Sequence, residues 1–254
     1  MLSVLTFNCN KGACNVDNIG SILRNSNPDI ICLQEFNQKV ATALQPYKFE
    51  DEYVFITAPL NQGWSSNVIY SRLPVTKSKY YSVEGKSRIN ILIRVLFNNN
   101  YVDVVCAHLD PGRSNSDIRA RQFHDLMSNF PESLTPMIIT GDFNMDITEL
   151  RNEWPPIAWN AAPLLSTFSS NNSCNMSPGK FNHPFDRCLY RGATLLDSKV
   201  LGIENIGSDH YGLLTTFQIG NTVPNRPHPQ IYVPPVMIPI PKINPFAIKM
   251  PPKY

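Results

Sequence analysis

Ten short apolar runs, each of strand length, occupy much of the sequence and restrict the chain to a fold built on β-sheets. They cover residues 3–7, 29–33, 53–57, 67–71, 89–97, 102–107, 137–140, 185–190, 194–200 and 212–219. The runs at 89–97 and 102–107 flank "NNN" at 98–100, which predicts a hairpin.

Helical patterns are fewer. Apolar residues at helical spacing occur over 16–23, with Asn15 or Asp17 as the expected N-cap. A second stripe covers 118–127, where Ser116 is the expected N-cap. Because strands outnumber helices and partly form hairpins, the sequence predicts an α+β fold with antiparallel or mixed sheets.

The length of 254 residues suits one large domain or two small ones, and the net charge of +2 excludes a strongly basic nucleic-acid binder. Any site for a polyanion must therefore be a local patch. No apolar stretch approaches about 18 residues, and the N-terminus lacks a basic and apolar leader pattern. We expect a soluble, intracellular protein without a membrane span, in the cytoplasm or the nucleus.

The composition changes near residue 220. Residues 1–220 carry the strand and helix patterns, whereas 221–254 are rich in proline, which excludes helices and central strands. We expect a catalytic domain followed by a Pro-rich extended tail. Its apolar residues favour an arm laid on its own domain or on a protein partner, with a free tail as the alternative.

Six cysteines are scattered without zinc-site spacing, and several lie inside apolar runs, as in "DIICLQE" and "VDVVCAH". A free thiol in such a run behaves as a small core side chain. This pattern favours a reducing compartment and free thiols, with a disulfide as the open alternative.

Five apolar runs lie next to side chains that can bind a metal, a water or a phosphate. Asn8 ends "LTFN", Glu35 ends "IICLQE" and His108 ends "VVCAH", while "GDFN" and "SDH" carry two such residues each. One such ending fits an ordinary turn. Five in one chain indicate a common site on the rigid ends of strands.

These residue types suit metal-assisted hydrolysis of a phosphodiester. Mg²⁺ prefers oxygen ligands and retains waters, so a carboxylate such as Glu35 suffices, with Mn²⁺ as the alternative ion. Asp142 can orient or deprotonate the attacking water, and Asn144 can hold it. His108 and His210 can donate to phosphoryl oxygens as charge develops. The spacing of His and Cys residues fits a zinc hydrolase less well.

The ordered motifs "TFN", "LQE", "HL", "GDFN" and "SDH" resemble the signature of the endonuclease/exonuclease/phosphatase superfamily over roughly residues 3–219. The resemblance implies a four-layer α/β sandwich, in which two mixed or antiparallel sheets are flanked by helices. It implies that Asn8 and Glu35 bind or support Mg²⁺, and that Asp209 assists the metal or the geometry of the site.

The same resemblance assigns catalytic roles. Asp142 and Asn144 would handle water and phosphate, and His210 would contact the phosphate. In "FDR", Asp186 would set the tautomer of His210.

Within the superfamily, the motifs are most similar to the 5′-tyrosyl-DNA phosphodiesterases, although Ser169 stands where that branch has Asp. Arg88 and Arg113 are candidates for substrate phosphate, with plain surface charge as the alternative. Trp64 is a candidate for stacking on a base or an aromatic leaving group, with loop packing as the alternative.

The sequence thus predicts a Mg²⁺-dependent phosphodiesterase that cleaves a protein tyrosine from a nucleic-acid 5′-phosphate. Two alternatives stay open. The first is another enzyme of the superfamily, such as an RNA 3′-exonuclease or a small phosphoester phosphatase. The second is a non-catalytic protein that binds through its Pro-rich tail.

Overall fold

The computed structural model describes residues 1–57, 66–82, 89–130, 134–152, 159–170, 172–174 and 182–220. They belong to the first of the two units into which the chain divides, Met1–Pro224. The predicted Pro-rich tail, 221–254, lies outside the described residues.

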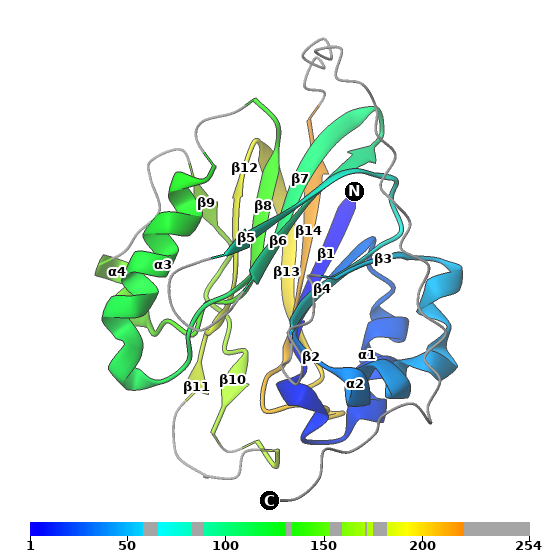
Figure 1. Cartoon of the computed structure of the whole chain (residues 1–254), viewed down its shortest axis with the longest axis vertical. Coiled ribbons are helices and arrows are strands. Elements are labelled where there is room, and N and C mark those ends of the chain that lie inside the picture. The colour runs from blue at the N-terminus through cyan, green and yellow to red at the C-terminus, as the bar shows by residue number, and fades with distance from the viewer. Residues whose placement is uncertain are drawn as a thin grey trace, which may run out of the picture. The chain divides into compact units, whose positions relative to one another are not determined.

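Two six-stranded sheets form the centre of this unit (Figure 1). The first has the strand order β13-β14-β1-β2-β4-β3 and the second β5-β6-β7-β8-β12-β9. The strands of the first are β1 (Leu2–Asn8), β2 (Ile30–Phe36), β3 (Val54–Thr57), β4 (Ser66–Ser71), β13 (Ala193–Leu201) and β14 (Gly212–Ile219). Those of the second are β5 (Val75–Ser82), β6 (Ile89–Phe97), β7 (Asn100–His108), β8 (Met137–Asp142), β9 (Asn160–Ala161) and β12 (Asp186–Arg191). A small ribbon pairs β10 (Phe168–Ser169) with β11 (Asn182–His183).

One parallel pair lies inside each sheet, and the other pairs of strands are antiparallel. In the first sheet β1 runs parallel to β2. In the second, β7 runs parallel to β8, and His108 lies opposite Asp142 in the register. The predicted mixed sheets are therefore confirmed.

Three apolar clusters hold the layers together. The first contains Val4 and Ile30 from one sheet with Ile93 and Val104 from the other, so it fills the space between the sheets. The second joins the outer face of the first sheet to α1 (Val16–Ser26) and α2 (Gln38–Leu44). The third joins the second sheet to α3 (Ser116–Ser128), and α4 (Ile147–Asn152) lies on the same side (Figure 1). This is the expected four-layer sandwich.

Local sequence explains two of these elements. Asn98 and Asn99 both have left-handed backbone (φ 47° and 62°), which gives the tight turn that joins β6 to β7 at the predicted hairpin. The stripe that predicts α1 is buried as expected, and Asn15 occupies its N-cap position. In α3 the N-cap position belongs to Asn115 and not to Ser116, which already has helical backbone.

The cysteines correct one expectation. Cys9, Cys32, Cys106 and Cys188 are free and buried, in agreement with thiols that pack as core side chains. Cys14 and Cys174 form a disulfide across 160 residues of sequence, so the expectation of free thiols fails for this pair.

Within the described part of the chain, each helix is too short or too polar to cross a lipid bilayer.

Candidate active site

Four strand ends meet where the two sheets adjoin. Asn8 is the last residue of β1, and Glu35 is the next-to-last residue of its parallel neighbour β2. His108 and Asp142 end the other parallel pair. Parallel neighbours end at the same edge of a sheet, which is where α/β proteins bind ligands.

The carboxylate of Asp142 is the hub of these side chains. Its Oδ2 accepts a hydrogen bond of 2.8 Å from the Asn8 amide and lies 3.6 Å from His108 Nε2 and 3.8 Å from His210 Nε2. Its Oδ1 accepts the backbone N–H of Asn144 at 2.8 Å. Residues from both sheets therefore contact one buried carboxylate.

The turn after β8 holds Asn144 against this hub. Asn144 has left-handed backbone (φ 51°), which Asn tolerates. Its side-chain amide nitrogen lies 3.2 Å from Asp142 Oδ2. The same nitrogen donates to the carbonyl of Leu109 at 3.0 Å, in the segment that follows β7. The "GDFN" motif thus forms a turn, as the ordinary-turn interpretation of the sequence predicts. This turn is part of the site.

Burial raises the pKa of Asp142, while the nearby His210 lowers it and the charge on Asp186 raises it again. The result is a carboxyl with a pKa above its ordinary value, which suits proton transfer better than an ordinary aspartate does.

His210 is held by Asp186, the first residue of β12. His210 Nδ1 lies 2.8 Å from Asp186 Oδ2, so Nε2 is directed towards Asp142. Burial opposes a charge on the imidazole, but the carboxylates of Asp186 and Asp142 outweigh it and raise the pKa of His210 to about 10. His210 is therefore a cationic hydrogen-bond donor at neutral pH. The predicted contact between Asp186 and His210 is present.

Glu35 and His108 connect the two sheets. Glu35 Oε1 lies 3.9 Å from His108 Nε2, the atom that also faces Asp142, so both carboxylates flank one imidazole nitrogen. The backbone N–H of His108 donates to the buried side chain of Asn90 at 3.0 Å. Glu35 has left-handed backbone (φ 51°), an uncommon conformation that marks functional sites in many proteins.

Two places in the site could hold a metal ion: the cluster of Asp142, Asp186 and His210, and the carboxylate of Glu35. Asp142, Asp186 and His210 offer ligand atoms within 4.8 Å of one another, but Asp186 and His210 already bond each other. Glu35 is an oxygen donor whose side chain is 16% exposed, which leaves room for the waters that Mg²⁺ retains. Glu35 therefore fits the predicted metal better.

Asn8 fits a supporting role. Its Nδ2 donates to Asp142 and its Oδ1 accepts the N–H of Asn10 at 2.9 Å, which fixes the amide at the base of the site. Asp209 precedes His210, is half-buried, and accepts a hydrogen bond of 3.2 Å from Ser208. The structure thus brings the predicted residues of all five motifs to one region.

The predicted substrate residues have different outcomes. Arg113 is exposed and begins the short 3-10 helix η4 (Arg113–Asn115) after β7. Arg88 and Trp64 lie outside the described residues.

One nearby residue was missed by sequence reasoning. Lys11 lies in the 3-10 helix η1 (Asn10–Gly12), and its ammonium is 3.8 Å from Glu35 Oε2. Asn10, Lys11 and Gly12 all have left-handed backbone. The glycine is a signal of such a turn, but nothing in the sequence indicates that the turn aims Lys11 at Glu35.

This arrangement can bind a phosphate ester and activate water. It combines a partly exposed carboxylate, a buried carboxylate of raised pKa, two imidazoles and an amide, all fixed by strand ends. Such a set supplies charge stabilisation and proton transfer at one position.

A family model described as the endonuclease/exonuclease/phosphatase family matches residues 5–210. Among curated proteins, no sequence matches the chain significantly.

Solved structures with a similar fold include TDP2 from D. rerio complexed with a single-strand DNA product, at a TM-score of 0.74 and 20% identity over 85% of this chain and 98% of that one. A truncated TDP2 from Caenorhabditis elegans has a TM-score of 0.71 and 19% identity over 85% and 96% of the two chains. The human Nocturnin catalytic domain with a bound sulfate anion has a TM-score of 0.67 and 19% identity over 86% and 94%.

Proposed function

The chain belongs to the endonuclease/exonuclease/phosphatase family, and from this premise we propose that it is a Mg²⁺-dependent 5′-tyrosyl-nucleic-acid phosphodiesterase. The enzymes of this family are hydrolases of phosphate esters that depend on a divalent metal, and the site holds carboxylates that could bind one. The proposal adds the ion, Mg²⁺, and the bond, which joins a protein tyrosine to a nucleic-acid 5′-phosphate.

The observation that carries the proposal is the position of Asp142. Its carboxylate contacts Asn8 from one sheet and the imidazoles of His108 and His210 from different elements. A phosphodiester in this region would meet an acceptor for the proton of water and two donors for its oxygens.

Each side chain has a separate task in this scheme. Asp142, oriented by Asn8 and Asn144, accepts a proton from the attacking water. The cationic His210, held by Asp186, donates a hydrogen bond to a phosphoryl oxygen. His108 donates to the same group from the other side. A divalent metal at Glu35 would offset charge on the phosphate in the transition state.

Two considerations support the proposed substrate class: the chemistry of the leaving group and the similar structures. A tyrosine phenol has a pKa of about 10 and leaves without a strong general acid. In this scheme His210 is held by Asp186 and Asp142 accepts the proton of water, so a leaving group that needs no strong general acid suits the site. The similar TDP2 of D. rerio is complexed with a single-strand DNA product, which supports a nucleic-acid substrate here.

The test is a substrate panel in Mg²⁺ and then in EDTA. It comprises a 5′-tyrosyl oligonucleotide, an abasic duplex, poly(A) and an inositol phosphate. We expect fastest turnover of the tyrosyl substrate, loss of turnover in EDTA, and a loss of about 10³-fold in kcat for Asp142→Asn. The control is Asp117→Asn, an exposed residue in the first turn of α3.

The panel also separates the proposal from its alternatives. Fastest turnover of poly(A) would indicate an exonuclease, and fastest turnover of inositol phosphate a phosphatase. No turnover of any substrate would favour a binding protein. Each of these results would overturn the tyrosyl assignment.

A further inference from the structure

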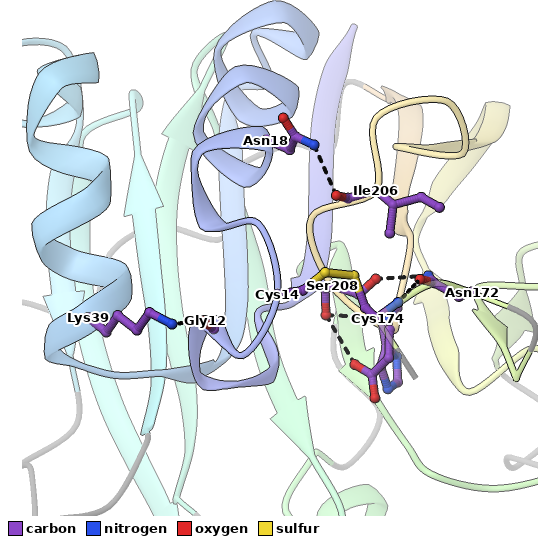
Figure 2. The surroundings of a disulfide bond; sticks show 10 residues. Gly12, Cys14, Asn18, Lys39, Asn172, Cys174, Ile206 and Ser208 are labelled. Atoms are coloured by element: carbon purple, nitrogen blue, oxygen red, sulfur yellow. Dashed lines mark hydrogen bonds between the residues drawn. A yellow bond between two sulfur atoms is a disulfide. The ribbon is translucent and has the colours of Figure 1, made fainter. Parts of the chain in front are cut away.

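The disulfide between Cys14 and Cys174 lies close to the loop that carries His210 (Figure 2). Cys14 is in the segment between η1 and α1, six residues after Asn8 at the end of β1. Cys174 belongs to the described residues 172–174. The two Cα atoms are 5.4 Å apart, a normal separation for a disulfide. The bond therefore joins a loop of the first sheet to a segment that is far away in sequence.

Asn172 connects the disulfide to the loop of His210. Its side-chain oxygen accepts the backbone N–H of Cys174 at 2.9 Å, and its side-chain nitrogen donates to the carbonyl of Ser208 at 2.8 Å (Figure 2). Asn172 is buried, so water does not compete for these bonds. The amide is thus a direct bridge from one partner of the disulfide to Ser208.

Ser208 in turn is hydrogen-bonded to the two predicted site residues that follow it. Its hydroxyl donates to Asp209 Oδ1 at 3.2 Å and accepts the backbone N–H of His210 at 3.3 Å. Ser208 is fully buried. Displacement of Ser208 therefore displaces both predicted site residues that follow it.

The same loop is held to α1 at a second point. Asn18 donates to the carbonyl of Ile206 at 3.0 Å (Figure 2), and a Cβ on Gly207 would meet Ile19 at 2.7 Å. The loop is therefore fixed on one side by α1 and on the other by Asn172. The second attachment is the one joined to the disulfide, through Cys174, and the backbone N–H of Asn172 also donates to the carbonyl of Ser169 at 3.1 Å.

We propose that Asn172 is a positioning residue for Asp209 and His210, and that the Cys14–Cys174 disulfide holds it in place, so that a dithiol reductant lowers the activity of the site. The effect on catalysis rests on the proposed function. The effect on the position of His210 does not.

The redox step is an ordinary thiol–disulfide exchange. A thiolate of the dithiol attacks one sulfur of the pair, which breaks the cystine bond and forms a mixed disulfide. The second thiol of the reductant then releases the remaining cysteine and closes its own disulfide. Two electrons and two protons pass from the dithiol to Cys14 and Cys174. Both cysteines are half-buried, and we expect a small dithiol to reach them.

The first experiment compares the full chain before and after reduction with dithiothreitol. We expect kcat to fall about 10-fold with little change in KM, because His210 is displaced from the reacting phosphate. The double variant Cys14→Ser, Cys174→Ser should start at the reduced level and not respond to dithiothreitol. It keeps the four buried thiols and so controls for reduction elsewhere. Equal kcat for the oxidised and reduced protein would overturn the proposal.

The second experiment needs no substrate. The imidazole NMR resonances of His210, assigned with His210→Gln, should shift on reduction of the full chain and in Asn172→Ala. They should stay unchanged in Asn129→Ala, which removes a similar amide-to-carbonyl bond from the exposed end of α3. Unchanged resonances in both the reduced protein and Asn172→Ala would overturn the positioning role, even if the double variant fails to fold. A protein that hydrolyses none of the substrates but shows these shifts would contradict only the proposed function.

Discussion

Individual charges in the site depend on one another because they are buried together. Asp186 and His210 form a buried contact of 2.8 Å, and the carboxylates around His210 raise its pKa from 6.5 to about 10. A histidine whose pKa is higher in the folded state stabilises the fold while it is charged. This contribution is complete below pH 6.5 and disappears as the pH rises through about 10.

This linkage predicts the behaviour of Asp186→Asn. The substitution removes the carboxylate partner of a buried cation, so we expect a loss of about 3 kcal/mol in the free energy of unfolding at pH 6. The difference from the unsubstituted protein should shrink as the pH approaches 10, where His210 loses its charge. Urea unfolding at pH 6, 8 and 10 measures it. A constant difference over this range would mean that His210 is not the group concerned.

The position of Lys11 leads to a second prediction at the level of single residues, which concerns the affinity for a divalent metal. Its ammonium lies 3.8 Å from Glu35 Oε2 and competes with any cation at that carboxylate. Because the lysine is largely exposed, Lys11→Ala should tighten the binding of a divalent metal only about 2- to 5-fold. Glu35→Ala should abolish it.

Calorimetric titration with Mg²⁺ or Mn²⁺ measures the metal affinity of Lys11→Ala and of Glu35→Ala. Lys48→Ala is the matched control, since Lys48 is also exposed and also has left-handed backbone. Weaker metal binding by Lys11→Ala would show that the ammonium supports the metal site.

At the level of elements, the end of β8 is shaped by a glycine. Gly141 has a positive φ of 151°, and a Cβ at this position would lie 1.9 Å from the carbonyl oxygen of Ala107 on β7. Glycine therefore lets β7 and β8 approach closely directly before His108 and Asp142. The position of the Asp142 carboxylate depends on this contact.

We therefore expect Gly141→Ala to lower the free energy of unfolding by at least about 3 kcal/mol, since both the backbone and the neighbouring strand must move. Gly220→Ala is the control, because a Cβ there meets nothing within 4 Å. Thermal or urea unfolding compares the two variants. Equal stability of both would contradict the close packing at Gly141.

The sequence predicted elements well where side-chain pattern and backbone agree. The hairpin at Asn98 and Asn99 and the amphipathic α1 follow from local chemistry alone. The strand β5 (Val75–Ser82) was missed because it is mostly exposed and polar, so it lacks the alternation that marks a half-buried strand. The short helix α2 was also missed, because its apolar pattern is brief. It does begin with a cap, Asn37, whose side chain accepts the N–H of Val40.

The placement of four candidate site residues at strand ends could be predicted from the sequence, whereas their contacts could not. Asn8, Glu35, His108 and Asp142 stand at strand ends, which the apolar runs reveal. The pairing of Cys14 with Cys174 depends on how distant segments meet in space, and spacing in the sequence carries no information on it.

At the scale of the whole molecule, the candidate site draws on both sheets of the first unit. All predicted site residues in the described part of the chain lie between Asn8 and His210, within the first unit, Met1–Pro224. Among the described residues, the three apolar clusters that bind the layers are built from residues between Leu2 and Ile219. We therefore propose that residues 1–220 are the catalytic domain.

Removal of residues 221–254 should leave kcat within about 2-fold of the full chain, because a domain with its own core folds alone. Turnover of the tyrosyl oligonucleotide and the midpoint of thermal unfolding are the measurements. A large loss of either would assign the tail to the domain itself.

The interior placement of the two parallel pairs has a consequence for how the protein loses activity on heating. The strands β1, β2, β7 and β8, which carry Asn8, Glu35, His108 and Asp142, each have hydrogen-bonded neighbours on both sides. Amide protons in such strands exchange with deuterium only when a large part of the molecule opens. On warming, fraying of the edge strands β3, β5, β9 and β13 should therefore leave hydrolysis intact. Inactivation should coincide with the main calorimetric transition, so that the enzyme is switched off abruptly instead of gradually.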